Sequence, residues 1–175
     1  KTYLPVPLQG VQDISLKAEG LKNLSVAAND KIYTTRDVSL ISTTDKEDST
    51  VTYGEIGDRD NDKKVNNVTV SAVGQKTLTV GNITAAGDVS LTSKFTQEGS
   101  SVGYGKIQAK NLTLNHSANA GMQGDVAYSD TIAPTGDFNV NASGYKELNI
   151  NNSTNQRITA TGDMTCLLYT SDAAD

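Results

Sequence analysis

Few side chains in this sequence are of the types that enzymes use for catalysis. His116 is the only histidine, and neither a Ser-His-Asp triad nor a metal-binding pair can be built around it. A solenoid enzyme that cleaves polysaccharide would instead need clustered carboxylates held at a fixed separation of a few ångströms. We therefore predict no catalytic residue, no cofactor and no enzymatic activity.

The acidic cluster at residues 58–62, with the sequence DRDND, is the segment that most resembles a metal site. Its alternating carboxylates suit calcium, which prefers oxygen ligands. The cluster lacks the central glycine and terminal glutamate of helix-loop-helix calcium sites, and it does not match the glycine-rich nonapeptide of calcium-dependent β-rolls. We expect a solvated charged loop and no metal site.

Asn67, Asn82 and Asn111 each begin an Asn-x-Ser/Thr triplet, which is the acceptor pattern for N-glycosylation. The same asparagines also belong to a recurring strand motif, in which Asn or Asp precedes an aliphatic residue. An asparagine at a corner, stacked as a ladder on its equivalents, accounts for the triplets more simply.

Tyr53, Tyr104 and Tyr128 recur in a repeated Val-x-Tyr pattern and are the candidate binding residues of the chain. We expect them to cover the rim of the core. The alternative is that they stack across repeats as a surface binding ridge for a sugar or a protein, because tyrosine combines an apolar ring with a polar tip.

The composition limits the fold and the partners of the chain. Only 36% of residues are hydrophobic and 5% are aromatic, which is too polar for a compact α/β enzyme of 175 residues. The net charge of −5 argues against a nucleic-acid or anionic-membrane partner, because both require basic patches. No segment approaches the roughly 20 apolar residues that span a bilayer, so we expect no membrane insertion.

Internal repetition is the strongest signal in the sequence. Residues 37–56 and 88–107 align without a gap at an offset of 51, and a looser third copy spans residues 111–132. Each copy begins with Asn or Asp followed by an aliphatic, a small polar and an aliphatic residue. This period of two predicts short strands with aliphatic side chains on one face, while glycine and Asx mark the corners between them.

These strands predict a parallel β-helix, an all-β solenoid in which single coils survive only by stacking on their neighbours. Residues 43–64 and 115–135 are less regular than the rest. We expect these two stretches to project from the coils as loops or hairpins.

Both ends of the sequence look cut. It begins with Lys1-Thr2-Tyr3, without an initiating methionine or a following apolar run, so we expect an internal fragment. Residues 166–175, CLLYTSDAAD, resemble a translated adapter of transposase-made sequencing libraries, and we interpret them as a non-native tail. Cys166 is the only cysteine, so the predicted solenoid, residues 1–165, has no thiol chemistry.

The corner-strand units at residues 81–93 (GNITAAGDVSLTS) and 109–117 (AKNLTLNHS) resemble the coils of filamentous-haemagglutinin-like large exoproteins, including leukotoxin-type filamentous adhesins of Gram-negative bacteria. The resemblance covers most of residues 10–165. It implies a right-handed parallel β-helix, secretion to the bacterial cell surface, and export through the outer membrane by a partner transporter, as in two-partner secretion.

The implied function is that of a structural or adhesive shaft. Such a shaft attaches the bacterium to a glycan or protein of the host-cell surface, or holds a distal effector away from the cell. Autotransporter passengers share the architecture and use another export route. The alternative function, from a different class, is a fragment of a solenoid carbohydrate-active enzyme or of a phage tailspike.

Overall fold

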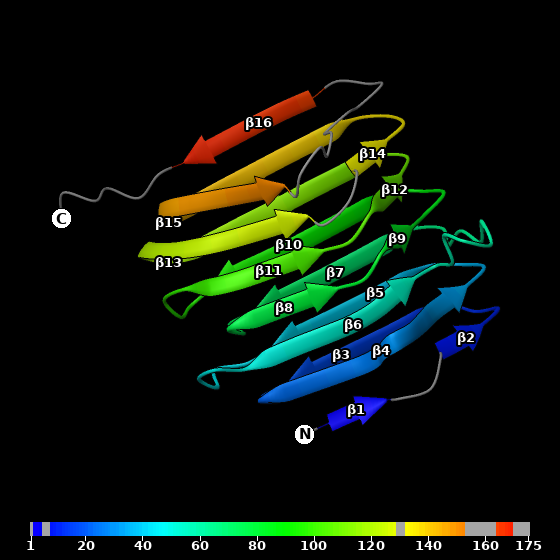
Figure 1. Ribbon diagram of the computed structural model, residues 1–175, viewed down its shortest axis with the longest axis horizontal. Helices are drawn as coiled ribbons and strands as arrows, with labels where there is room; N and C mark the ends of the chain where they lie inside the picture. The colour runs from blue at the N-terminus through cyan, green and yellow to red at the C-terminus, as the bar shows by residue number, and fades with distance from the viewer. Residues whose placement is uncertain (1, 5–7, 129–131, 153–163, 170–175) are drawn as a thin grey trace.

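The computed structural model describes residues 2–4, 8–128, 132–152 and 164–169. The chain is all-β, with 68% strand and 0% helix, and its parallel strands stack into a β-solenoid of about 5 turns (Figure 1). This architecture confirms the predicted fold class. In the part of the chain that is described, no helix could cross a membrane.

Each turn contributes strands to three faces of the solenoid. The first face contains β3 (Ile14–Glu19), β5 (Val38–Thr43), β7 (Val68–Val73), β10 (Val89–Phe95), the first halves of β13 (Leu112–Tyr128) and β15 (Phe138–Asn152), and β16 (Met164–Tyr169). The second face contains β1 (Thr2–Leu4), the start of β4 (Asn23–Thr34), β6 (Thr50–Ile56), β8 (Thr77–Val80), β11 (Ser100–Tyr104) and the second halves of β13 and β15. The third face contains β2 (Leu8–Gly10), the ends of β4 and β6, β9 (Ile83–Thr84), β12 (Ile107–Ala109) and β14 (Ile132–Pro134).

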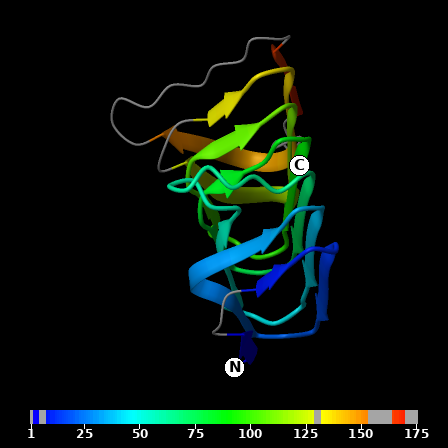
Figure 2. The ribbon, with the colours of Figure 1, turned by 90° about the vertical axis from the view of Figure 1, so that its right-hand side faces the viewer.

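The coil is right-handed, as predicted. In Figure 1 the second face lies in front and its strands run to the right, while successive turns are added upward from the N-terminus. Figure 2, seen from the right, shows the third-face strands leading from the front to the rear, where the first face lies. A right-handed path is the rule for parallel strands, because their right-handed twist favours it.

The core is built from columns of aliphatic side chains that run along the solenoid axis. Every second residue of a first-face strand points inward, so equivalent residues of neighbouring turns meet in register. The side chains of two such columns are at most 1% exposed. These columns are Val38-Val68-Val89-Leu112 and Leu40-Val70-Leu91-Leu114.

The corner before the first face carries a ladder of Asx side chains. Oδ1 of Asp37 accepts a hydrogen bond from the backbone N–H of Asn67 at 2.9 Å, and Oδ1 of Asn67 accepts one from Asp88 at 2.9 Å. Asn111 and Asp137 repeat the contact at 2.8 Å. The side chain of one turn thus satisfies the backbone of the next, which confirms the predicted corner ladder for Asn67 and Asn111. For Asn82 the prediction is wrong, because its equivalents on the neighbouring turns are Glu55 and Lys106 and not Asx residues.

Glycine precedes Asx at two of these corners because the ladder occupies the space of a side chain. A Cβ at Gly87 would overlap Oδ1 of Asn67, and a Cβ at Gly136 would overlap Oδ1 of Asn111. The Gly-Asx pairs of the sequence are therefore packing requirements between turns.

The 51-residue repeat corresponds to two turns of the solenoid. Val38 is in register with Val68, and Val68 with Val89, so the two best-matched copies are separated by one intervening turn. The third copy stacks directly on the second, because Val89 is in register with Leu112. The repeat found in the sequence is real, but its period is twice that of the structural unit.

The predicted projecting stretches are only partly correct. Within residues 43–64, β6 lies in the second and third faces, and the segment at residues 57–64 projects (Figure 1). Within residues 115–135, β13 continues through the first and second faces, so the prediction of a loop there is wrong. Polar residues and glycines hid this strand in the sequence, and residues 129–131 lie outside the described residues.

The backbone of β16 includes the first four residues of the stretch interpreted as a non-native tail. It pairs in parallel with β15, with Cys166 in register with Val140. Residues 170–175 lie outside the described residues. Strand pairing gives the path of the backbone and not the origin of the residues, so the interpretation stays a prediction.

Candidate functional site

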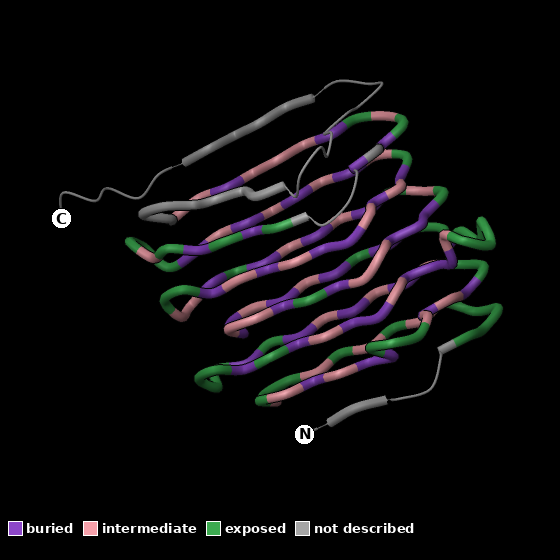
Figure 3. The backbone as a smooth tube through the Cα atoms, in the orientation of Figure 1, coloured by how far each residue is buried: buried purple, intermediate pink, exposed green. Residues whose placement is uncertain are grey.

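Two of the three candidate tyrosines, Tyr53 and Tyr104, face the core and do not form an exposed ridge. Tyr53 is 1% exposed and Tyr104 is 2% exposed, because both occupy inward positions of second-face strands. Buried positions recur along the strands of this face (Figure 3). Val80 lies in register between them, so the two tyrosines do not stack on each other. Tyr128 is in register with Tyr104, but its side chain lies outside the described residues. The ridge interpretation is therefore wrong for Tyr53 and Tyr104.

Burial decides the chemistry of the Tyr53 hydroxyl. No hydrogen-bond partner for this hydroxyl lies within the described residues. Loss of solvation raises the pKa of Tyr53 to about 12, since a buried phenolate is costly. The side chain is a neutral core residue at physiological pH.

An open groove of about 960 Å³ lies outside these tyrosines, on the second face and its corner with the third face. It crosses several turns, from β4 through β6, β8 and β11 to β13. Its floor includes three glycines at equivalent corner positions, Gly54, Gly81 and Gly105. Small floor residues keep the groove open.

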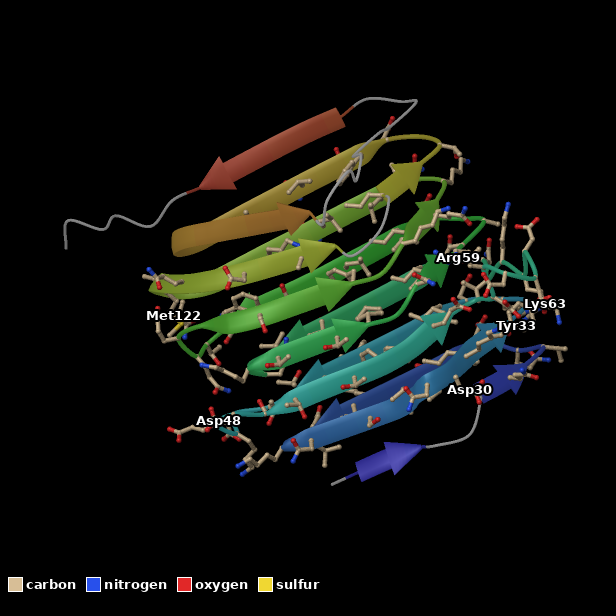
Figure 4. The ribbon with its side chains drawn as sticks, viewed as in Figure 1. Asp30, Tyr33, Asp48, Arg59, Lys63 and Met122 are labelled. Carbon is tan, nitrogen blue, oxygen red and sulfur yellow. The ribbon has the colours of Figure 1, made fainter. Side chains whose placement is uncertain are left out.

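A bulge in β4 forms one side of the groove. The pairing between β4 and β6 shifts between Val26 and Lys31, so that four residues of β4 stand opposite Gly54 alone. Ala27 begins the bulge with a φ of 47°, and a Cβ at Gly54 would lie 2.5 Å from the carbonyl oxygen of Asp30. Only glycine fits beneath this bulge, which places Asp30 at the edge of the groove (Figure 4).

Charged side chains converge at the corner end of the groove. Nζ of Lys31 lies 3.1 Å from a carboxylate oxygen of Asp58 and 3.9 Å from one of Glu55. The side-chain amide of Asn82 donates a hydrogen bond to Glu55 at 3.0 Å, and its oxygen accepts one from the backbone of Lys106 at 2.9 Å. This network fixes Glu55, whose side chain is 16% exposed, beside the groove.

The same contacts shift two pKa values in opposite directions. The hydrogen bond to Asp58 raises the pKa of Lys31. The hydrogen bond from the side chain of Asn61, followed by that from Lys31, lowers the pKa of the Asp58 carboxyl. Both groups are therefore held in their charged forms.

The projecting segment at residues 57–64 closes this corner. Asp58 and Lys63 pair as an antiparallel bridge, and Asn61 donates its side-chain amide to Asp58 at 2.7 Å. Nζ of Lys63 lies 5.9 Å from the centre of the Tyr33 ring, within cation–π range (Figure 4). The carboxylate predicted to lie in a solvated loop is thus an anchor between the loop and Lys31. Among the described residues no group of three or more acidic, His or Cys side chains could hold a metal ion.

His116, the histidine dismissed as a catalytic residue, is buried in the first face. It is 1% exposed, and its Nδ1 lies 2.7 Å from Oγ of the buried Ser93 on the preceding turn. Sequence reasoning missed this pair. A signal was available, because Ser93 and His116 stand at the same place after the aliphatic positions Val89 and Leu112.

Comparisons with known proteins give no relative: no protein-family model, curated protein or solved structure matches the chain. The resemblance to filamentous exoproteins therefore stays a prediction from the sequence motifs.

Proposed function

We propose that the chain is a segment of the structural and adhesive shaft of a secreted bacterial surface filament. The observation that carries the proposal is axial continuity. On the first face and at the corner before it, the aliphatic columns, the backbone pairing and the Asx ladder all run along one axis from turn to turn between β5 and β13.

This arrangement suits a spacer under tension. The backbone hydrogen bonds of a parallel solenoid point along the axis, so a pull along the rod loads many bonds and the stacked core together. Each turn contacts its neighbours, and length is added by repeating turns. A shaft needs these properties, and a catalytic domain does not.

The proposal includes the location and the partners of the parent protein. A shaft acts on the bacterial surface after export through the outer membrane, with a partner transporter in two-partner secretion or by the autotransporter route. Its contacts are a glycan or protein of the host-cell surface. A role in virulence follows from that attachment.

Immunoelectron microscopy of bacteria that carry the parent gene tests the location. Antibodies raised against the 175-residue chain should label filaments outside the outer membrane, and a strain with the gene deleted serves as the control. Label confined to the cytoplasm would contradict the proposal. Cleavage of polysaccharides by the purified chain would favour the enzyme or tailspike alternative instead.

A further inference from the structure

The floor of the groove continues outward from the glycine corner as a strip of small residues. Thr52, Thr79, Gly103 and Ala127 occupy outward, mutually registered positions on successive turns. No side chain in this row is larger than threonine. The strip is thus flat and runs along the axis, which suits an extended ligand lying across the turns.

The groove offers no apolar anchor among its described lining residues. Tyr53, Val80 and Tyr104 contribute to its wall, but their side chains are at most 2% exposed and belong to the core. Peptide and protein partners usually bind through aromatic or aliphatic anchors that fill pockets. This floor suits such partners poorly.

The groove does offer hydrogen-bonding groups fixed on several elements. Carboxylates of Asp30 on β4 and Glu55 on β6 line it, together with Asp60 from the projecting segment and the amide of Asn82. Hydroxyl groups of a sugar both donate and accept hydrogen bonds, and bonds to a carboxylate are stronger than those between neutral groups. The chemistry therefore favours a polyhydroxylated ligand.

The charge of the lining narrows the choice of sugar. Of the charged residues that line the groove, Asp30, Glu55 and Asp60 are acidic and Lys31 is basic, and Lys31 is already engaged by Asp58 and Glu55. Asp60 also pairs at 3.7 Å with Arg59, which lies outside the lining, so the lining itself keeps an excess of negative charge. A sialylated, uronic-acid or sulfated glycan would meet like charge in the groove. We propose that the groove binds a chain of neutral sugars that lies along the solenoid axis across β6, β8 and β11.

This inference rests on the proposed adhesive function and specifies its ligand. Glycan binding by the purified chain is measured separately from the location of the parent protein on the cell. The 175-residue chain is applied to an array of immobilised neutral oligosaccharides of glucose, galactose, mannose and N-acetylhexosamines, beside sialylated, uronic-acid and sulfated ones. The strongest neutral ligand is then titrated by calorimetry. Binding should be confined to neutral glycans.

Gly103→Gln is the decisive variant. A Cβ at Gly103 has no atom within 4 Å, so a larger side chain fills the groove without disturbing the fold. We expect affinity to fall by about tenfold or more. Thr69→Gln, at an exposed outward position of the first face, is the matched control and should bind like the wild type.

Three results would overturn the inference: no neutral glycan bound, binding confined to acidic glycans or peptide probes, or neutral binding that Gly103→Gln leaves unchanged. Circular dichroism of each variant shows whether it is folded. Failure of glycan binding with filaments still labelled on the cell surface would remove the groove inference alone. Absence of labelled filaments would remove the shaft proposal.

Discussion

Oγ of Ser93 and Nδ1 of His116 lie 2.7 Å apart in the interior of the solenoid, on adjacent turns of the first face. Both side chains are at most 1% exposed. Burial is the dominant effect on the imidazole and lowers the pKa of His116 to about 4. Near neutral pH this contact joins two neutral polar groups inside an aliphatic core.

The first prediction is a loss of stability on mild acidification. In the unfolded chain His116 takes up a proton near pH 6.5, whereas the folded chain resists protonation until about pH 4. The unfolded state binds more protons in this window, so the free energy of unfolding should fall as the pH drops from about 6.5 to about 4. The loss should total roughly 3 kcal/mol, at 1.36 kcal/mol per pKa unit. Urea titrations at several pH values measure it.

His116→Gln is the control for this prediction, because His116 is the only histidine and glutamine does not titrate. The variant should be less stable than the wild type at pH 7, but its free energy of unfolding should change little between pH 6.5 and 5. Ser93→Ala should keep the pH dependence, since burial and not the serine is the main cause of the shift. An unchanged slope in His116→Gln would contradict the assignment.

The second prediction concerns the central aliphatic column. Leu91 is fully buried between Val70 and Leu114 of the neighbouring turns. Leu91→Ala should lower the free energy of unfolding by about 2–5 kcal/mol, because it removes buried methyl groups and leaves a cavity between turns. Thr69→Ala, one turn away on the outer surface, should change it by about 0.5 kcal/mol or less. Chemical denaturation measures the free energy of unfolding of both variants. An equal loss in the two would mean that the aliphatic column does not form the core.

The sequence predicted the parts of the fold that depend on local periodicity. Val89 and Leu91 alternate with small polar residues, and Asp88 follows Gly87, so the strand and its corner could be inferred without a structure. The bulge of β4 over Gly54 could not be inferred from the sequence, because it depends on which residues of neighbouring turns come into register. The groove is a consequence of that register and was missed with it.

The inward direction of the tyrosines was harder to infer for the same reason. Val51 and Tyr53 share one face of β6, so the alternation of the strand places the ring on the core side, whereas we expected it at the rim of the core. A large ring with a hydroxyl was nevertheless compatible with the rim. Val80, a smaller residue on the intervening turn, lies in register between Tyr53 and Tyr104 and leaves space for their rings. The 51-residue offset aligned the two tyrosines directly and gave no indication of this intervening turn.

The third prediction tests the glycine corners. Gly87→Ala should destabilise the protein by about 1–3 kcal/mol, since a Cβ there overlaps Oδ1 of Asn67. Asn67→Ala loses the ladder bond to Asp88 but removes the nearest of the atoms that a Cβ at Gly87 would meet. The double variant should therefore cost less than the sum of the single ones, a coupling measured by a double-mutant cycle.

A second glycine supplies the control for the corner. Gly103 has open space at its Cβ position, so Gly103→Ala should be neutral or stabilise the chain by about 0.5 kcal/mol. Equal destabilisation by Gly87→Ala and Gly103→Ala would show that strand propensity, and not the Asx side chain, determines where glycine is needed.

The last prediction concerns Gln97, whose side chain joins three turns at the corner between the first and second faces. Its amide nitrogen donates to the carbonyl oxygens of Gly74, one turn away, and Lys46, two turns away, each at 2.8 Å. Its oxygen accepts the backbone N–H of Asp48, which has a φ of 52°, at 2.9 Å. One side chain therefore holds the left-handed residue of a distant turn in place.

Gln97→Glu is the informative change, because it keeps the shape and the acceptor while removing both donors. The carboxylate would face the two carbonyl oxygens, and we expect the free energy of unfolding to fall by about 1–3 kcal/mol. Raising the pH through the carboxyl's titration should increase this loss, since only the ionised form repels both carbonyls. Lys94→Ala, an exposed neighbour, should have little effect. Hydrogen exchange of the Asp48 backbone amide should accelerate in the glutamate variant and not in the control. Equal protection of this amide in both variants would mean that the Gln97 side chain does not stabilise the corner.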